Sequence, residues 1–297
     1  MNSVFGEPES AKSFLAEAAV TVVLGGGGKA LIVDLDHNGV QATVNRLLQL
    51  GVGEEVLGDL DRFRYVEPED KAHLELVVVD AVGWAPDVAV VDSTGELLPL
   101  LRLNSNSPDD FTVAHATVLK PLAAAGAAVI AIDHLPKNTE NKAHGPTGTA
   151  AKRRAIGGVA IRVTVKDPFT PGKGGSAILT LNKDRHGGLR RHCTLEGREP
   201  TIGVFRLTAD MGFEIRAPLV GDGADALGVS AEDLAQLDVL DPPPVSVRDV
   251  KDRLGWGSTR ATNTLSVWRS RVPTPRGEER GTRSVPVPGL FPRNEEQ

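Results

Sequence analysis

The sequence has almost no cysteine, whose disulfides stabilise many secreted proteins, and it has no segment that resembles a membrane anchor. Its 297 residues include one cysteine, Cys193, which excludes a disulfide framework and a cysteine-based zinc site. No apolar run approaches the roughly 18 residues that a membrane-spanning helix needs. The first residues also lack the basic segment and apolar stretch of a signal peptide. We therefore expect a cytoplasmic protein with no membrane partner.

Aromatic residues are scarce as well, at 4% of the chain against 40% hydrophobic residues in all. The core must therefore consist mainly of Val, Leu, Ile and Ala. The length allows one large or two modest domains.

The formal net charge of −6 is unevenly distributed. Residues 245–297 carry ten Lys and Arg against six Asp and Glu, so the rest of the chain is strongly acidic. A basic C-terminal region on an acidic body suggests contact with an anion such as nucleic acid, although a solvated arm would look the same.

Short apolar runs rich in β-branched residues alternate with helical stretches. The runs cover 30–33, 88–91 and 128–132, and the helical stretches cover 12–24, 71–81 and 111–125. Fully apolar runs suit strands buried on both faces of a parallel sheet, and their alternation with helices predicts an α/β domain. The glycines at 25–28 are interpreted as a turn after the first helix.

Beyond residue 160 the pattern becomes β-like, with strands expected over 160–165, 177–181 and 204–207. Asp241-Pro242-Pro243-Pro244 is a stiff segment typical of a boundary between domains. Beyond this segment we expect two helices, one over 245–254 that Ser246 could cap and one over 259–269. Two short helices in succession predict a small helix-turn-helix or winged-helix unit. The expected organisation is therefore an α/β domain over 1–215, a linker over 216–244, the small unit over 245–292 and a disordered tail over 293–297.

A candidate phosphate-binding loop opens near the N-terminus. Gly6, Lys12 and Ser13 stand at the spacing of G-x-x-x-x-G-K-[ST], directly before a helix-like stretch. Such a loop aims backbone N–H groups at phosphates, brings a lysine to the β- and γ-phosphates and places a hydroxyl on Mg²⁺. The pattern has glycine where this chain has Ala11, and a chance match on a surface loop is the alternative. The predicted ATP-binding residues are Gly6, Glu7, Pro8, Glu9, Ser10, Ala11, Lys12, Ser13 and Phe14.

An acidic residue completes this candidate site. Asp92 follows the apolar run 88–91, where a carboxylate at a strand tip can meet Mg²⁺, usually through water. An aspartate after a strand is more often a turn residue, but paired with the loop it predicts a magnesium site formed by Ser13 and Asp92. ATP and Mg²⁺ are thus the expected cofactors.

The order of these motifs resembles RecA-like P-loop ATPases of the RepA hexameric-helicase type, found on plasmids and actinobacterial phages. The resemblance covers about residues 4–190 and rests on Phe-Gly-Glu-Pro-Glu-Ser-Ala-Lys-Ser, Leu-Ile-Val-Asp-Leu-Asp, Val-Val-Asp-Ser, Ile-Asp-His-Leu-Pro-Lys and Asn-Lys-Asp-Arg-His-Gly. It implies a RecA-like core with a mainly parallel sheet, a homo-oligomer that is a hexameric ring, and ATP hydrolysis coupled to movement on single-stranded DNA.

The resemblance also assigns roles to individual residues. Asp36 stands where the family has a catalytic glutamate that polarises the attacking water, and aspartate is one methylene shorter. His134 matches a residue that senses the γ-phosphate. Lys183 and Arg185 match a Lys-x-Arg pair that such rings insert into the neighbouring subunit's site, where arginine stabilises charge on the transferred phosphoryl group.

Nucleic-acid contacts are expected in two places. Residues 137–166 hold seven Lys and Arg and one acid, Glu140, and within them Lys152, Arg153 and Arg154 follow a segment rich in Gly, Thr and Asn. Such a basic loop could hold a single-stranded backbone, and a solvated loop is the alternative. In the C-terminal unit, Arg260 and Arg269 would suit a recognition helix, and an intramolecular docking module would explain them as well.

Three functions remain open at this point. The first is an ATP-hydrolysing motor on DNA, which would use all the candidate residues named above. The second is a nucleotide-binding regulator with little or no hydrolysis, which Ala11 and Asp36 favour. The third is a DNA-binding protein whose α/β domain is a scaffold. Only 1–5 precede the loop, so either the first strand is very short or the sequence begins inside a longer reading frame.

Overall fold

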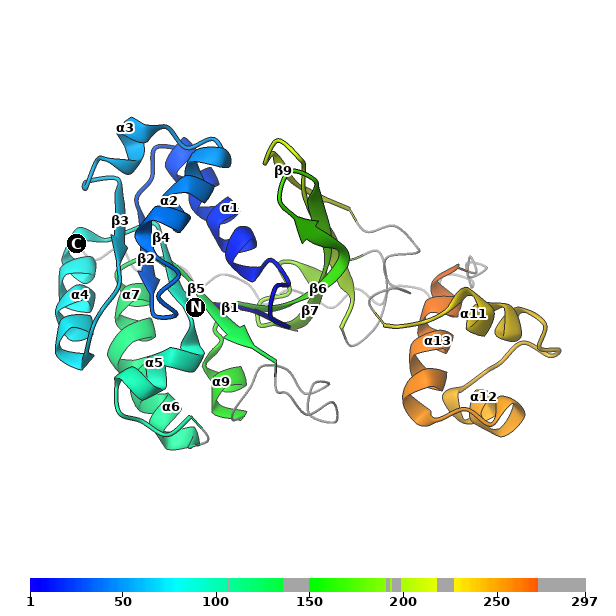
Figure 1. The fold of residues 1–297 in the computed structure, drawn as a ribbon. Coiled ribbons are helices and arrows are strands. Elements are labelled where there is room, and N and C mark those ends of the chain that lie inside the picture. The colour runs from blue at the N-terminus through cyan, green and yellow to red at the C-terminus, as the bar shows by residue number, and fades with distance from the viewer. Residues whose placement is uncertain (106, 136–149, 191–192, 194–198, 218–226, 272–297) are drawn as a thin grey trace, which may run out of the picture.

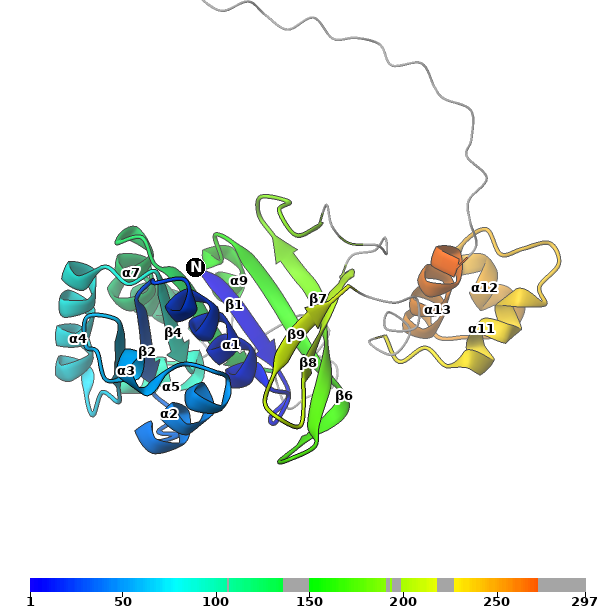
Figure 2. The same ribbon diagram turned by 90° about the horizontal axis from the view of Figure 1, so that it is seen from above.

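The computed structural model describes residues 1–105, 107–135, 150–190, 193, 199–217 and 227–271. One nine-stranded mixed sheet with helices on both faces forms the larger part of it (Figures 1 and 2). The α/β class expected from the alternating pattern is thereby confirmed. Within these ranges no helix has the length and apolarity needed to cross a membrane.

The strands are β1 (Asn2–Gly6), β2 (Ala30–Asp34), β3 (Phe63–Val66), β4 (Val88–Asp92), β5 (Ala128–His134), β6 (Val159–Thr170), β7 (Gly174–Asp184), β8 (Thr201–Leu207) and β9 (Phe213–Arg216). The helices beside the sheet are α1 (Lys12–Gly25), α2 (Val40–Gln49), α3 (Glu54–Leu57), α4 (Lys71–Trp84), α5 (Thr94–Leu100), α6 (Pro108–Ala114), the π-helical η1 (His115–Leu119), α7 (Lys120–Ala124) and α9 (Ala150–Ala155). The stretch predicted as one helix over 111–125 is thus α6, η1 and α7 in immediate succession.

The strand order is β3-β2-β4-β5-β1-β6-β7-β8-β9. Every pair from β3 to β6 is parallel, and the pairs from β6 to β9 are antiparallel. The sequence analysis did not expect β3 and β9. Both are four-residue edge strands that carry charged residues, so neither is the fully apolar run that predicts a buried strand.

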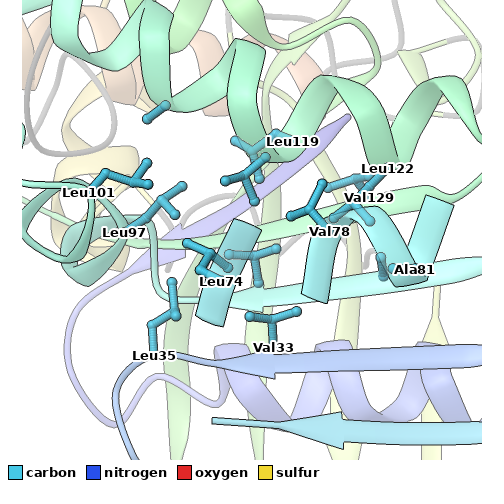
Figure 3. Close-up of a cluster of buried hydrophobic side chains, with 14 of the residues drawn as sticks. Val33, Leu35, Leu74, Val78, Ala81, Leu97, Leu101, Leu119, Leu122 and Val129 are labelled. Carbon is cyan, nitrogen blue, oxygen red and sulfur yellow. The ribbon is translucent and has the colours of Figure 1, made fainter. Parts of the chain in front are cut away.

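The parallel strands are apolar because they are covered on both faces. In β2, Leu31 and Val33 belong to a cluster that includes Leu74 and Val78 of α4. Figure 3 shows Val33 below these two leucine and valine side chains of α4. The alternate residues Ala30 and Ile32 face a second cluster with residues of α1 and α2. This period of two explains why all five residues of β2 are buried.

The helices that follow the adjacent strands β1 and β5 lie on opposite faces of the sheet. The helix after β1, α1, packs on the α2 side, whereas α9, the next described helix after β5, belongs to the cluster around α4 to α7. β1 and β5 pair in parallel, so this change of face falls between two neighbouring strands. In open α/β sheets, ligands bind in the crevice at such a point.

A unit of three helices follows the sheet domain, formed by α11 (Ala231–Asp238), α12 (Val247–Leu254) and α13 (Ser258–Arg271) (Figure 1). Its core joins Leu237 of α11 to Val250 of α12 and Leu265 of α13. The predicted boundary at residue 245 is therefore wrong, since α11 lies in the predicted linker and is part of this core. Ser246 caps α12 as expected, by accepting a bond from the Asp249 N–H. Residues 272–297, which include the predicted tail and the place for a wing, lie outside the described residues.

The core predicts a contrast within α4. Leu74 is fully buried against the sheet, and Leu76 on the same helix is 69% exposed. Leu74→Ala should lower the free energy of unfolding by about 2–5 kcal/mol through lost burial and a cavity. Leu76→Ala should change it by less than about 0.5 kcal/mol. Urea denaturation followed by circular dichroism measures both, and equal losses would contradict the packing described for α4.

Candidate nucleotide-binding site

The loop between β1 and α1 requires glycine at its first position. A Cβ on Gly6 would lie 2.4 Å from the Val163 carbonyl oxygen and 2.6 Å from Ser10 Oγ. The loop then turns through two residues with left-handed backbone, Glu9 at φ 60° and Ala11 at φ 67°. Glycine adopts this conformation freely and alanine does not, which is the physical reason for glycine in the motif where this chain has Ala11.

The N-terminus of α1 is free of protein caps. Ala11 stands at the N-cap and offers no side-chain acceptor, and no acidic residue lies in the first turn. Leu15 is the first residue whose N–H returns to the loop, at 3.0 Å from the Ala11 carbonyl. The N–H groups of Lys12, Ser13 and Phe14 therefore have no acceptor within the helix, and the dipole of this fourteen-residue helix favours an anion there.

Two further groups of the loop fit an anionic ligand. Ser10 Oγ is buried and has no hydrogen-bond partner among the described residues. Lys12 is buried too, and its Nζ donates to the Glu7 carbonyl at 2.7 Å, which holds the ammonium over the loop. Burial lowers the pKa of Lys12, whereas Asp92, Asp36 and Asp133 oppose this shift. The loop thus combines unused hydrogen-bond donors with a partly desolvated cation.

Ser13 and Asp92 meet where the loop faces the end of β4. Ser13 Oγ donates to Asp92 Oδ2 at 2.9 Å. Octahedral Mg²⁺ with ligands at 2.0–2.1 Å places neighbouring oxygens about 2.9 Å apart, so the two atoms are spaced like adjacent ligands of one ion. Among the described residues no three His, Cys, Asp or Glu side chains form a metal site by themselves. The pair therefore suits Mg²⁺ that takes its remaining ligands from phosphate and water.

The carboxylate of Asp92 lies in an unfavourable electrostatic environment. Burial, together with the neighbouring charges of Asp36 and Asp34, raises its pKa to about 6 against the lowering effect of the bond from Ser13. Removing a carboxylate's water without supplying a full counter-charge disfavours its ionised form. A bound divalent cation would reverse that balance.

An ion pair that was not predicted from the sequence lies next to Ser13 and Asp92. Arg46 of α2 contacts Glu17 of α1 at 2.7 Å, and burial raises the pKa of Glu17 to about 7 against the lowering effect of Arg46. A small cavity of ≈ 10 Å³ lies between the two pairs and is lined in part by Asp34 and Asn38. The only sequence signal was charge at helical positions 17 and 46, which normally indicates an exposed face.

The predicted base and sensor lie side by side. Asp36 Oδ1 accepts from Ser93 Oγ at 2.7 Å, and Asp36 Oδ2 is 3.6 Å from His134 Nε2. The nearby imidazole of His134 lowers the pKa of Asp36 below its usual value, and burial acts against it. Asp36 follows β2, Ser93 follows β4 and His134 ends β5, so one carboxyl edge of the sheet brings them together.

The Lys-x-Arg pair and the basic run lie together, away from the loop. Lys183 Nζ donates to the carbonyls of Arg153 at 2.6 Å and Ile156 at 2.7 Å, and so caps the end of α9. Arg153 contacts the Asn182 carbonyl, whereas Arg154 and Arg185 are exposed. The segment 136–149, which includes most of the predicted basic loop, lies outside the described residues.

Lys152 differs from the prediction that it contacts nucleic acid. Its side chain is 7% exposed, and Nζ lies 2.7 Å from Asp133 Oδ2. The side chain points into the α6 region, where Nζ is 5.8 Å from the ring centre of Phe111. A buried, paired ammonium is not available to a phosphate backbone, so this prediction is wrong for Lys152.

The two predicted arginines of the C-terminal unit also have partners inside that unit. Arg260 forms an ion pair with Asp233 at 2.5 Å and stacks on Trp256, and Arg269 donates to the Val245 carbonyl at 2.5 Å. These contacts join α13 to α11 and to the start of α12. Both arginines therefore contribute to the packing of the unit itself.

Comparison with models of known protein families gives no match, and comparison with curated proteins gives none either. The function must therefore be inferred from the geometry of the site itself.

The left-handed conformation of Ala11 predicts that glycine is better there. Ala11→Gly should raise the free energy of unfolding by about 1 kcal/mol, because it removes a left-handed penalty larger than the entropy that glycine adds to the unfolded chain. Ala16→Gly, within α1, should instead destabilise by about 1 kcal/mol or more. Parallel urea denaturation of both variants checks the sign, and a loss in Ala11→Gly would contradict the described loop backbone.

The raised pKa of Asp92 predicts a pH-dependent stability. A native pKa of about 6 lies above the ordinary value of 3.8, so the native state holds this proton more tightly than the unfolded chain. The resulting stability is full below pH 3.8 and is lost as the pH rises through about 6. As the pH rises from 3.8 to about 6, the free energy of unfolding of the wild type should fall relative to that of Asp92→Asn. Urea denaturation at a series of pH values, without divalent cations, measures this difference. A difference that stays constant across this window would show that Asp92 is not perturbed.

Proposed function

We propose that this protein binds a nucleoside triphosphate with Mg²⁺ at the loop after β1 and hydrolyses it, as a RecA-like P-loop motor that acts on DNA. One observation carries the proposal: the uncapped start of α1, the buried Lys12 and the Ser13–Asp92 pair converge at one point. These groups meet at the carboxyl edge of the parallel strands. The point lies beside the strand pair β1 and β5, whose following helices cover opposite faces of the sheet. The motif spacing in the sequence supports the same site independently.

Binding uses groups that have few protein partners. The free N–H groups at the start of α1 would receive phosphate oxygens, and Lys12 would exchange the Glu7 carbonyl for the β- and γ-phosphates. Ser13 and Asp92 would hold Mg²⁺, directly or through water. When bound, the ion neutralises phosphate charge and stabilises the leaving oxygens.

Hydrolysis needs a group that orients water against the γ-phosphate. Asp36 is the candidate, because Ser93 and His134 hold it at the carboxyl edge of the sheet, where its charge acts on Lys12. Its lowered pKa keeps it ionised at neutral pH, so it can accept a hydrogen bond from water. His134 would then both orient Asp36 and lie close to the transferred phosphoryl group.

The proposed action on DNA rests on exposed cations and on the motif resemblance. Arg154 of α9 and Arg185 beyond β7 are exposed on adjacent elements. They could meet single-stranded DNA or, in a homo-oligomeric ring such as a hexamer, the nucleotide of a neighbouring subunit. A cytoplasmic setting fits this proposal.

A second candidate is a nucleotide-binding regulator with little turnover. The left-handed Ala11 favours it, since a Cβ at a left-handed position of this turn costs energy. The shorter carboxylate arm of Asp36 favours it as well.

Steady-state ATP hydrolysis with and without single-stranded DNA separates these functions, with Lys12→Ala as the control. The motor predicts turnover that DNA stimulates and that Lys12→Ala lowers by at least about 100-fold. Calorimetric titration with Mg·ADP measures binding separately. Wild-type binding without turnover above the Lys12→Ala level would favour the regulator. An absence of binding in both proteins would exclude any nucleotide function.

A further inference from the structure

The short segment that carries Asp36 is organised around another aspartate. Asp34, the last residue of β2, is buried, and its carboxylate accepts bonds from the Asp36 N–H at 3.1 Å and the Asn38 N–H at 2.8 Å. The Asn38 side-chain amide adds a third bond at 3.0 Å. One carboxylate therefore fixes the backbone on both sides of His37, whose φ of 55° marks the turn.

The same segment is tied to β4 through its backbone. The N–H groups of Leu35 and Asp36 both donate to the Asp92 carbonyl, at 2.5 Å and 3.1 Å. The place of the Asp36 carboxylate relative to Asp92 therefore depends on the Asp34 side chain and on one carbonyl of β4. A rotation of the Asp34 carboxylate would release the Asn38 N–H and leave the Asp36 N–H to the Asp92 carbonyl alone, which loosens the segment that carries Asp36.

Tyr65 of β3 holds the Asp34 carboxylate. Its hydroxyl donates to Asp34 Oδ2 at 2.6 Å and also lies within hydrogen-bonding reach of Glu67. Burial and the two neighbouring carboxylates raise the pKa of Tyr65, so the phenol keeps its proton and remains a donor. Two carboxylates thus lie beside this phenol, and Glu67 in turn approaches His37 Nδ1 at 3.7 Å.

We propose that Tyr65 is a positioning residue for hydrolysis, which acts through Asp34 to place Asp36 against the attacking water. The inference rests on the proposed function and adds to it a residue from the edge strand of the sheet. Tyr65 itself contacts neither the loop nor the Ser13–Asp92 pair among the described contacts. Its loss should therefore affect the chemical step and leave nucleotide binding almost unchanged.

Tyr65→Phe tests this with minimal change of shape. The expected result is a fall in kcat of about 10-fold, since a displaced base loses its alignment with the water. The dissociation constant for Mg·ADP should stay within about 2-fold of wild type. Both quantities come from the assays described for Lys12, applied to the full chain.

Two control variants separate positioning from general loosening of β3. Arg64 precedes Tyr65 on the same strand but pairs with Asp80 at 2.6 Å and stacks on Trp84. Arg64→Met should leave kcat unchanged. Glu67→Gln removes the charge of the second partner of Tyr65 and should also leave kcat nearly unchanged, because Asp34 is the partner that organises the segment.

The outcomes are distinct from those of the proposed function. Wild-type turnover that depends on Lys12, together with an unchanged kcat in Tyr65→Phe, overturns only this inference. An equal fall in Arg64→Met overturns it too, because the effect would then come from β3 as a whole. If the wild-type protein binds no Mg·ADP, both the proposed function and this inference are wrong.

Discussion

The common direction of β2, β4, β5 and β1 is the constraint on which the candidate site depends. Parallel pairing aligns Asp34 with Asp92 and Gly6 with His134, so the strands end along one edge. Each loop that leaves this edge then brings one functional group to the same small region. Residues separated by more than a hundred positions in the chain become neighbours because the strands share a direction and a register.

The same alignment concentrates negative charge. Asp34, Asp36, Asp92 and Asp133 all lie at or just beyond the carboxyl edge. Three of them have organised partners: Asp34 has Tyr65 and Asn38, Asp36 has His134 and Ser93, and Asp133 has Lys152. Asp92 has the Ser13 hydroxyl, an uncharged donor, and its pKa is raised. The least compensated carboxylate therefore lies beside the start of α1, where a cation accompanied by phosphates would be most favourable.

The buried ion pairs extend outward from this edge to the helices. Lys152 attaches α9 to the end of β5, and Arg46 attaches α2 to α1. Breaking either pair would leave a buried charge without a partner, which costs far more than the intact pair contributes. These contacts explain how charged side chains are accommodated inside the fold.

The amino-acid sequence by itself determined the α/β class, the three central strands 30–33, 88–91 and 128–132, and the loop with Lys12, Ser13 and Asp92 as a candidate phosphate and magnesium site. These features are local, since apolar runs and motif spacing depend only on neighbouring residues. Only the tertiary structure decided that Lys152 is buried, that α11 belongs to the C-terminal unit, and that Tyr65 and Asp34 surround the segment of Asp36. The energy of a charged or polar side chain depends on partners distant in the chain, and the sequence pattern does not contain that information.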